Sequence, residues 1–359
     1  MAEKGHDIII AAPGNTPLYD KSKKKGFPTH AVAFKRSSLV KDFSGLRNLF
    51  KKYKPHILNT HGNEDSKIAL SAAMGTGIPL KILSRHISAH VRKSWYNTLL
   101  YKHLCHHVFT TADYTTRYLI QAFSIQKEKV QTISSGIIPP KSLMDRTDAR
   151  KWLAGELSLE SGTRFVGFVG RVSSDKGVDI IIRAFHRISA RIPHHLAVIG
   201  SGTEQYLTEL RSLANNLNIG HRVHFTGFRE DVWPYYSAIE CKMLASRDIN
   251  GIPFEGIPQS ILEAMYARCP VLGSMSGGIP DVVSHDVTGL LFRMNDEEDL
   301  SEKLLKVLND EKGSQKRAEK AFRMVQDHHT IDAMGNKIIK IYQDFLAEPG
   351  LRPTHTRPD

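Results

Sequence analysis

Short apolar runs alternate with stretches of helical periodicity through the first third of the chain. The runs that predict strands span residues 7–12, 56–59, 80–83, 107–111 and 129–133. Apolar residues spaced three and four apart predict helices over 65–74, 94–104 and 115–123. Several of the runs are continuously apolar, which is typical of strands buried on both faces. This alternation predicts βαβ units and a mostly parallel sheet.

A second series of the same kind follows a polar stretch over 136–148, which contains Pro139-Pro140 and is interpreted as a linker. Its predicted strands span 164–169, 195–199, 223–225, 239–244 and 270–273. Its predicted helices span 178–190, 204–216, 231–237, 260–267, 299–308, 314–326 and 334–346.

The two series predict an α/β chain made of two Rossmann-like, doubly wound domains that face a cleft. The expected boundaries are 1–140 for the first domain, 141–160 for a linker region, 161–333 for the second domain, and 334–359 for a helix and tail that pack back toward the first domain. A length of 359 residues fits two domains. Ligands of such sheets bind beyond the carboxyl ends of the strands, so the cleft is the expected site.

Composition narrows the class of protein. The three cysteines are far apart and offer no disulfide framework or metal-ligand spacing. No run approaches 18 apolar residues, and the first residues lack the apolar core of a signal peptide. We therefore expect a cytoplasmic protein with reduced thiols.

The positive charge is concentrated in the first half. Residues 1–151 hold 25 Lys and Arg against 10 Asp and Glu, whereas the remainder holds 24 against 27. Lysines gather at positions 21–25 and 51–54. Such a surface favours a polyanionic partner, either an anionic membrane surface or a phosphorylated acceptor, although a solvated basic face is the alternative. No nucleic-acid-binding motif accompanies the charge, so no nucleic-acid partner is expected.

Two glycine-containing turns follow predicted strands of the second half. The first, residues 170–177, places Gly170 beside two cations, Arg171 and Lys176, just before a helix. Cations and helix amides at a strand end suit a diphosphate, although a turn with surface charges is the alternative. The second turn contains Gly200. It lacks the full dinucleotide fingerprint, which counts against a nicotinamide cofactor.

A pair of carboxylates lies further along. Glu255 precedes a loop, and Glu263 lies one turn into the helix that follows. Ionised carboxylates only accept hydrogen bonds, so this pair suits sugar hydroxyls. The sequence around Phe228 follows another strand and could border a nucleobase, although a lone phenylalanine is more often part of the core. In the first half, His61 and His86 both follow strands, although most of the 18 histidines are expected to be structural or solvated.

In this order, the motifs resemble those of retaining glycosyltransferases of the GT-B fold, specifically family four. The matching segments are Gly170-Arg171 with Lys176-Gly177, Gly200-Ser201-Gly202, Phe225-Thr226-Gly227-Phe228, Glu255 with Glu263, and residues 267–271, 277–281 and 288–292. Weaker similarity runs through 56–62, 82–86 and 108–137. The lipopolysaccharide and lipid-linked glycan type is the expected branch.

The resemblance implies a role for each residue. Arg171 and Lys176 would contact the donor diphosphate, Glu263 the ribose, and Glu255 the hydroxyls of the transferred sugar. His86 would hold the sugar near the reacting centre. The remaining implied donor contacts are Gly170, Gly200, Phe228, Arg229, Gly256, Ile257, Pro258 and Gln259. No metal or cofactor is implied, and the sequence contains no Asp-x-Asp to bind a metal.

The start of the chain departs from the family pattern. Members begin with a strand, a glycine-rich loop and a long helix, whereas residues 1–6 resemble the end of that helix. On this basis the first strand and helix of the first domain are expected to be absent. That strand would be central in its sheet, so an inactive nucleotide-sugar-binding protein is one alternative function.

The function expected from the resemblance is transfer of a sugar from a nucleoside-diphosphate sugar to a lipid-linked or lipopolysaccharide-type acceptor, peripherally on the inner face of a membrane. The first domain would bind the acceptor and the second the donor. A soluble small-molecule acceptor is the main competitor, and a nucleotide-sugar epimerase or a phosphorylase of similar fold is a further one. The motifs leave open the base, the sugar, the acceptor and the oligomeric state.

Overall fold

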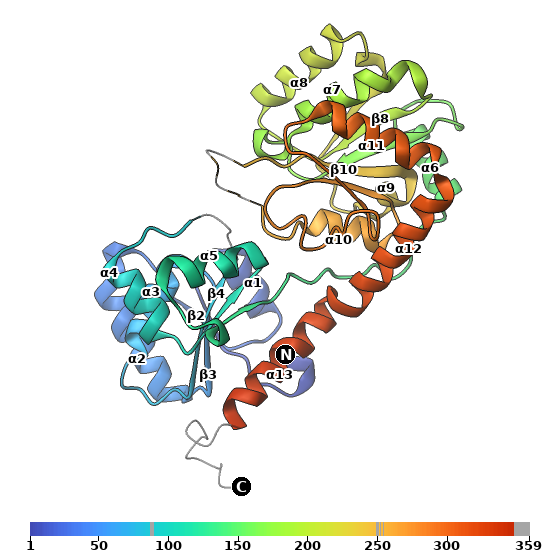
Figure 1. The fold of residues 1–359 in the computed structure, drawn as a ribbon. Coiled ribbons are helices and arrows are strands. Elements are labelled where there is room, and N and C mark those ends of the chain that lie inside the picture. The colour runs from blue at the N-terminus through green and yellow to red at the C-terminus, as the bar shows by residue number, and fades with distance from the viewer. Residues whose placement is uncertain (87–89, 249–250, 252, 254, 348–359) are drawn as a thin grey trace. The chain divides into compact units, whose positions relative to one another are not determined.

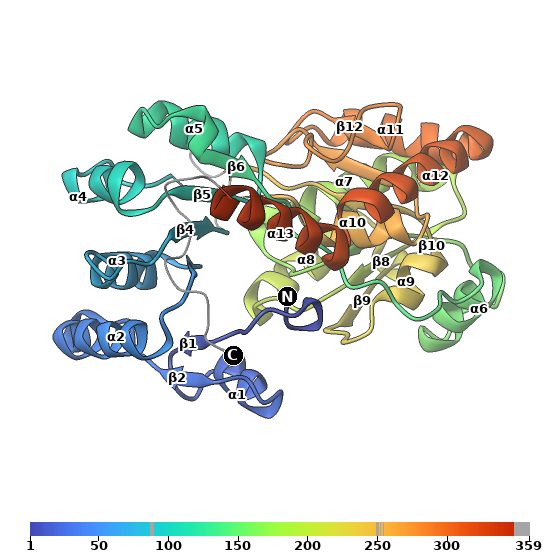
Figure 2. The same cartoon turned by 90° about the horizontal axis from the view of Figure 1, so that it is seen from below.

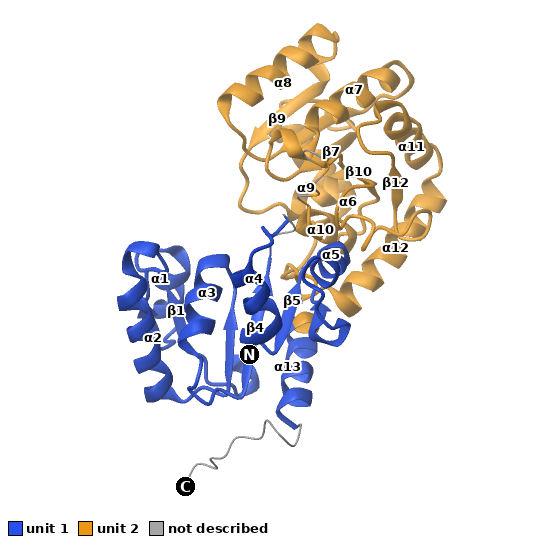
Figure 3. Ribbon diagram, turned by 60° about the vertical axis from the view of Figure 1, so that its left-hand side comes forward, with its two compact units in different colours: residues 1–86, 90–133, 335–359 blue, residues 87–89, 134–334 orange. Residues whose placement is uncertain are grey.

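The computed structural model describes residues 1–86, 90–248, 251, 253 and 255–347 (Figure 1). These residues divide into two compact units (Figure 3). Unit 1 comprises residues 1–86, 90–133 and 335–347, and unit 2 comprises the described residues of 134–334. Within the described parts of the chain, no helix is both long and apolar enough to cross a membrane.

Unit 1 contains two parallel sheets. Strands β1 (Ile10–Ala12) and β2 (Thr29–Ala31) pair with each other. The other sheet has the order β3-β4-β5-β6, formed by Ile57–Thr60, Leu80–Arg85, His107–Thr110 and Val130–Thr132. The helices of the unit are α1 (Pro17–Lys24), α2 (Leu39–Tyr53), α3 (Asn63–Ala72), α4 (Trp95–Leu99), α5 (Asp113–Phe123) and most of α13 (Ile331–Ala347). A π-helical turn, Leu100–Leu104, continues α4.

Side chains of β5 alternate between the two faces of the larger sheet. Val108 lies in a buried cluster with Leu119 of α5. His107 and Phe109 point the other way and contact α13, with ring centroids 4.8 Å from Phe345 and 6.5 Å from Tyr342 respectively. Figure 2 shows α2 to α5 in a row along the strands and α13 on their other side. The period of two along the strand therefore provides both packing faces.

Unit 2 is a six-stranded parallel sheet of order β12-β11-β10-β7-β8-β9. In chain order its strands are β7 (Phe165–Val169), β8 (His195–Ile199), β9 (Val223–Gly227), β10 (Ile239–Leu244), β11 (Val271–Ser274) and β12 (Leu290–Phe292). The chain winds outward in one direction from β7 to β9 and in the other from β10 to β12. The switch point therefore lies between β7 and β10, where ligands of such sheets bind.

Helices cover the sheet of unit 2. They are α6 (Arg146–Glu156), α7 (Val178–Ile188), α8 (Glu204–Asn216), α9 (Trp233–Ala238), α10 (Gln259–Tyr266), α11 (Glu297–Asn309) and α12 (Glu311–His328). Helix α7 packs against α8 and α11, whereas α9 packs against α6 and α10, and α10 against α12. Val178, Ile181, Ile182 and Phe185 of α7 are fully buried, which is the spacing of one helix face.

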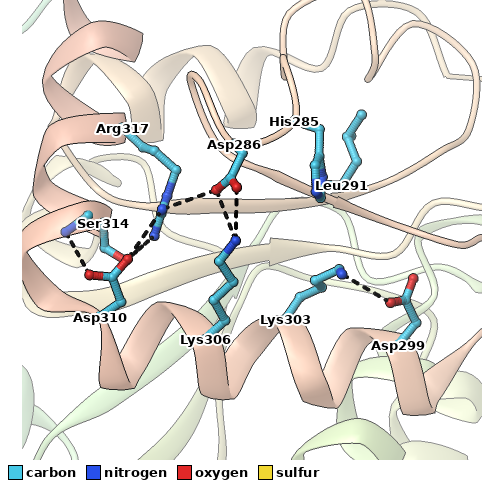
Figure 4. A network of polar contacts seen from close by, with 10 residues as sticks. His285, Asp286, Leu291, Asp299, Lys303, Lys306, Asp310, Ser314 and Arg317 are labelled. Carbon is cyan, nitrogen blue, oxygen red and sulfur yellow. Dashed lines mark hydrogen bonds and ion pairs between the residues drawn. The ribbon is translucent and has the colours of Figure 1, made fainter.

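A polar network fixes the last helices of unit 2 (Figure 4). Asp286 accepts hydrogen bonds from Lys306 of α11, at 3.0 Å, and from Arg317 of α12, at 3.2 Å. Asp310 caps the first turn of α12 and also pairs with Arg317. His285 accepts from the backbone N–H of Leu291 at 3.0 Å, so the turn that follows Gly277–Asp281 is tied to β12.

The predicted elements and the structure differ mainly in the first half. In unit 2, β8, β10 and α8 have the predicted bounds, and the other predicted elements differ by a few residues at their ends. Strand β12 was not predicted. In unit 1, β2, α1 and α2 were not predicted, because β2 is only three residues long, α1 is mostly polar, and few residues of α2 are buried. The expected linker over 141–160 contains helix α6, which Asp145 caps and which belongs to unit 2. Unit 2 begins at residue 134, not 161.

Candidate functional site

Glycines bring the loops at the carboxyl ends of β7 and β8 into backbone contact. Gly170 and Gly200 have φ values of +147° and +140°, which disfavour other residues. A Cβ atom on Gly200 would lie 1.8 Å from the carbonyl oxygen of Gly170, and one on Gly202 would lie 2.2 Å from that of Val172. The N–H of Val172 donates to the carbonyl of Ser201 at 2.8 Å. Both loops are therefore fixed side by side, with the loop after β7 next to the switch point.

The turn after β7 carries Arg171 and Lys176. The Arg171 side chain is 71% exposed and lies 3.5 Å from Asp175, whereas Lys176 is 19% exposed. Burial alone would raise the pKa of Asp175, but the Ser173 hydroxyl and these two cations lower it. Gly177 ends the turn at φ +65°, and a Cβ there would lie 2.1 Å from the carbonyl oxygen of Ala245. The turn is thus packed against the end of β10.

The Glu255 carboxylate forms an ion pair with Lys176 near the carboxyl ends of β10 and β11. Its Oε2 atom lies 2.5 Å from the Lys176 Nζ and accepts from the Ser246 hydroxyl at 2.6 Å. Its carbonyl oxygen accepts from the N–H of Gly278 at 3.1 Å. The Glu255 side chain is 10% exposed, so the pair is largely removed from water. Sequence reasoning selected both residues, and the structure brings them together.

Residues 256–259 lead from Glu255 into helix α10. Ile257 and Pro258 are buried, Gly256 is half-buried, and Gln259 is exposed as the first residue of the helix. Pro258 occupies the N-cap position and provides no side-chain cap. Its carbonyl oxygen accepts from the N–H of Ile261 at 3.1 Å and of Leu262 at 3.3 Å. The amides of Gln259 and Ser260, at the very start of the helix, are donors of the kind that suits an anion.

Glu263 lies one turn into α10. Its Oε2 atom accepts from the hydroxyl of Tyr236 in α9 at 2.9 Å. Burial raises the pKa of Glu263, while Tyr236 and Lys242 oppose that rise. Both carboxylates of the predicted pair interact electrostatically with a buried lysine that was not predicted from the sequence.

That lysine is Lys242 of β10, whose side chain is fully buried. Burial lowers the pKa of Lys242 to about 7, with Glu255 opposing the shift and Lys176 reinforcing it. Lys242 could have been selected from the sequence, because it is a lysine inside the mainly apolar run 239–244.

Phe228 and Arg229 follow β9. Phe228 is 71% exposed. Arg229 donates to the Tyr235 hydroxyl at 2.6 Å and pairs with Glu156 of α6. Phe228 is therefore exposed to solvent, whereas Arg229 is engaged with α6 and α9.

In unit 1, His61 and His86 follow β3 and β4 and contact each other. The Nδ1 atom of His61 lies 3.0 Å from the Nε2 atom of His86, and the rings stack. Burial, followed by repulsion from His86, lowers the pKa of His61; burial also lowers the pKa of His86, while Asp65 opposes both shifts. Near neutral pH both rings are therefore uncharged, and one ring N–H donates to the other ring.

Comparisons with known proteins agree on the family. Residues 1–139 match the model described as Glycosyltransferase Family 4, and residues 153–324 match Glycosyl transferases group 1. An N-acetyl-alpha-D-glucosaminyl L-malate synthase of Bacillus anthracis is 26% identical over 57% of this chain and 50% of its own. A GDP-mannose-dependent phosphatidylinositol monomannoside mannosyltransferase of Corynebacterium glutamicum is 30% identical over 55% and 52%. The chain spans about half to three-fifths of the length of the first curated relatives it matches.

Solved structures agree on the fold. A glycosyltransferase from Rickettsia africae superposes with a TM-score of 0.83 at 17% identity, covering 97% of this chain and 92% of its own. A protein from Anabaena, solved in complex with UDP, superposes with a TM-score of 0.79 at 18% identity, covering 96% and 94%. At these identities the likeness establishes the two-domain α/β fold. With one family model on each half of the chain, the protein belongs to the group 1, family four glycosyltransferases of the GT-B fold.

Proposed function

We propose that this protein is a metal-independent, retaining glycosyltransferase that moves a sugar from a nucleoside-diphosphate sugar to a lipid-linked or lipopolysaccharide-type acceptor. The observation that carries the proposal is the Lys176–Glu255 pair at the switch point of the unit 2 sheet. It combines a cation suited to phosphate with a carboxylate suited to sugar hydroxyls.

The donor diphosphate would lie against Arg171, Lys176 and the first amides of α10. Arg171 is mostly exposed and can turn toward a ligand, and the α10 amides lie in the helix that begins four residues after Glu255. Gly170 and Gly200 would let the phosphates approach the backbone closely. Related solved structures support this donor class, since the Anabaena protein was also solved with UDP-glucose.

The sugar and ribose hydroxyls would donate to Glu255 and Glu263, and Phe228 would border the base. In the transfer step, the bond from the anomeric carbon to the diphosphate oxygen breaks, and the acceptor oxygen bonds the same carbon on the same face. The acceptor proton passes to an oxygen of the departing diphosphate. Arg171, Lys176 and the amides would stabilise the negative charge that develops there. His86 would hold the sugar.

A lipid-linked acceptor is favoured by the surface of unit 1. Residues 35–41 place three exposed cations, Lys35, Arg36 and Lys41, around Leu39 and Val40, which are 49% and 80% exposed. Exposed apolar and basic side chains together suit an anionic bilayer surface. The names of two relatives, from Corynebacterium glutamicum and Campylobacter jejuni, include a phosphatidylinositol mannoside and a diphospho-undecaprenol.

A soluble acceptor is the second candidate. Other relatives are named for malate and for inositol 3-phosphate, both of which are small and water-soluble. Transfer assays with a lipid-linked and a soluble acceptor, each supplied with the same labelled donor, separate the two. Release of sugar without acceptor would instead indicate a hydrolase, and conversion of the donor sugar an epimerase.

The substitution Glu255→Gln tests the proposed site. We expect UDP, GDP, ADP or CDP to raise the melting temperature of both the wild type and the variant, because the diphosphate contacts remain. Transfer from the corresponding sugar nucleotide should fall about 100- to 1000-fold, since the amide can no longer accept from the sugar as a carboxylate does. The measurements are a thermal-shift screen and turnover with labelled donor.

Glu302→Gln is the matched control, because Glu302 is an exposed carboxylate of α11. It should leave both melting temperature and turnover unchanged. Undiminished turnover in Glu255→Gln would overturn the assignment of the sugar site. If no nucleoside diphosphate stabilises the wild type, the donor class itself is wrong.

A further inference from the structure

Strand β10 places a lysine where its neighbours are apolar. Lys242 lies between Cys241 and Met243, and all three side chains are fully buried. Within the described part of the chain, the Lys242 Nζ makes no hydrogen bond. Burial of an ammonium group without such a partner is strongly unfavourable, whereas a methionine would fill the same space at no such cost. The presence of lysine here calls for a reason other than packing.

The charged groups around Lys242 belong to the site described above. Glu255 and Glu263 attract its ammonium group, and Lys176 repels it. The other titratable neighbours are neutral, because burial raises the pKa of the Cys269 thiol to about 12 and raises that of the Tyr236 hydroxyl well above its usual range. Lys242 therefore interacts electrostatically with two carboxylates and one competing cation.

Lys176 has two possible partners. In the structure its ammonium group lies 2.5 Å from Glu255. In the proposed function the same group binds the donor diphosphate. When it turns to the phosphates, the Glu255 carboxylate, which is only 10% exposed, loses its nearest cation. A carboxylate so far removed from water needs another counter-charge.

We propose that Lys242 is a positioning residue of the donor site, whose buried ammonium group supplies the counter-charge that keeps the Glu255 carboxylate in place when Lys176 turns to the donor diphosphate. This inference rests on the donor contacts proposed above for Lys176 and Glu255. It adds a third charged residue, which is fully buried and does not itself touch the donor.

Proton uptake on donor binding follows from this arrangement. Burial lowers the pKa of Lys242 to about 7, and the nearby Lys176 charge contributes to the lowering. As Lys176 moves toward the phosphates, its repulsion of Lys242 weakens while the attraction by Glu255 persists. Lys242 then binds a proton more tightly, so donor binding above about pH 7 takes up a proton by linkage.

The substitution Lys242→Met separates this role from a purely structural one. The variant should fold and should melt at the same or a higher temperature near pH 7, because it removes a buried charge. The unfolded chain keeps the Lys242 proton to about pH 10, whereas the folded chain releases it near pH 7. Wild-type stability should therefore rise with pH across that interval relative to the variant. A structural lysine would instead lower the melting temperature when replaced.

Isothermal titration with UDP and with GDP measures the coupling. At about pH 8, where both nucleotides are fully ionised, wild-type binding should take up a fraction of a proton, seen as different heats in buffers of different ionisation enthalpy. Lys242→Met should take up none and should bind about tenfold or more weakly at about pH 7. Its affinity should change little with pH, whereas wild-type affinity should fall up to about tenfold per pH unit above pH 7.

The substitution Glu302→Gln is the matched control, because it removes an exposed charge from α11, whereas the charges that act on Lys242 are those of Glu255, Glu263 and Lys176. It should leave proton uptake and its pH dependence as in the wild type. Equal proton uptake by the wild type and Lys242→Met, or a destabilised Lys242→Met with unchanged binding, would overturn the role proposed for Lys242. Absence of UDP and GDP binding to the wild type would instead count against the proposed donor site.

Discussion

At the scale of single residues, the position of Glu255 depends on a neighbouring glycine. Gly277 has φ +54°, and a Cβ atom there would lie 2.2 Å from the Glu255 carbonyl oxygen. We expect Gly277→Ala to displace the Glu255 backbone, to lower the free energy of unfolding by about 1–3 kcal/mol and to weaken nucleoside-diphosphate binding. Chemical denaturation and a binding titration measure the two effects.

Gly335→Ala is the control for that substitution. Gly335 lies in helix α13, where nothing within 4 Å would meet a Cβ and φ is not positive. Alanine there should stabilise the protein by up to about 1 kcal/mol and leave binding unchanged. A Gly277→Ala variant with wild-type stability and affinity would show that the loop tolerates a side chain, and that the glycine is not needed to hold Glu255.

Some residues of the candidate site could be predicted from the sequence, and others could not. Lys176 and Glu255 were predictable, because charged residues at the ends of predicted strands converge at one edge of a parallel sheet. The role of Lys242 was not predictable, because the sequence does not show which charged residues interact with a lysine inside an apolar run. The engagement of Arg229 by Glu156 was equally hidden, since the two residues are 73 positions apart and meet only through the packing of α6.

At the scale of elements, a buried carboxylate joins α6 to the sheet. Glu240 of β10 accepts from Arg150 of α6 at 2.9 Å, from Arg164 at 2.6 Å and 2.7 Å, and pairs with His194 at 3.1 Å. Burial alone would raise the pKa of Glu240, but the hydrogen bonds from His194 and Arg164 outweigh it and hold the pKa far below its usual range. Helix α6 is thus held by charge as well as by apolar packing.

Substitution of Glu240 by Gln should therefore destabilise unit 2. We expect a loss of about 2–4 kcal/mol near neutral pH, less than for a fully buried pair because Arg164 and Arg150 are partly exposed. Because the folded pKa is lowered, this contribution is complete above about pH 5 and declines as the pH falls toward the folded value. Denaturation of the wild type and variant between about pH 3 and 7 should show the difference narrowing in acid. A constant difference would contradict the ionic origin.

Elements differed in how well the sequence predicted them. Most strands and helices of unit 2 were predictable, because its strands are mainly apolar and its helices carry a regular buried stripe, as α7 does. Helix α2 was missed because only Asp42, Leu46 and Phe50 among its 15 residues are buried, and Asp42 is itself charged. Helix α6 was missed because prolines and polar residues precede it, and its apolar face is short.

At the scale of the whole molecule, charge is divided between the two halves of the chain. The excess of Lys and Arg lies within residues 1–151, and the remainder is slightly acidic. Two groups of exposed lysines lie in unit 1. The first, in and just after α1, comprises Lys21, Lys23, Lys24 and Lys25, and the second, at the end of α2 and just after it, comprises Lys51, Lys52 and Lys54. Composition revealed this asymmetry, but only the structure showed that residues 35–41 combine exposed cations with exposed apolar side chains.

That combination predicts which substitutions weaken binding to anionic vesicles. The double variant Leu39→Ser/Val40→Ser keeps every charge, yet it should reduce co-sedimentation with phosphatidylglycerol vesicles about tenfold or more, because a buried Leu or Val side chain contributes about 1.5–3 kcal/mol. The double variant Lys51→Gln/Lys52→Gln, at the other end of α2, removes two charges. It should reduce co-sedimentation less, because each cation near the vesicle surface adds about 1 kcal/mol, and only at low salt. Equal effects of the two variants would indicate adsorption by charge alone, and absence of wild-type binding at low salt would favour the soluble acceptor.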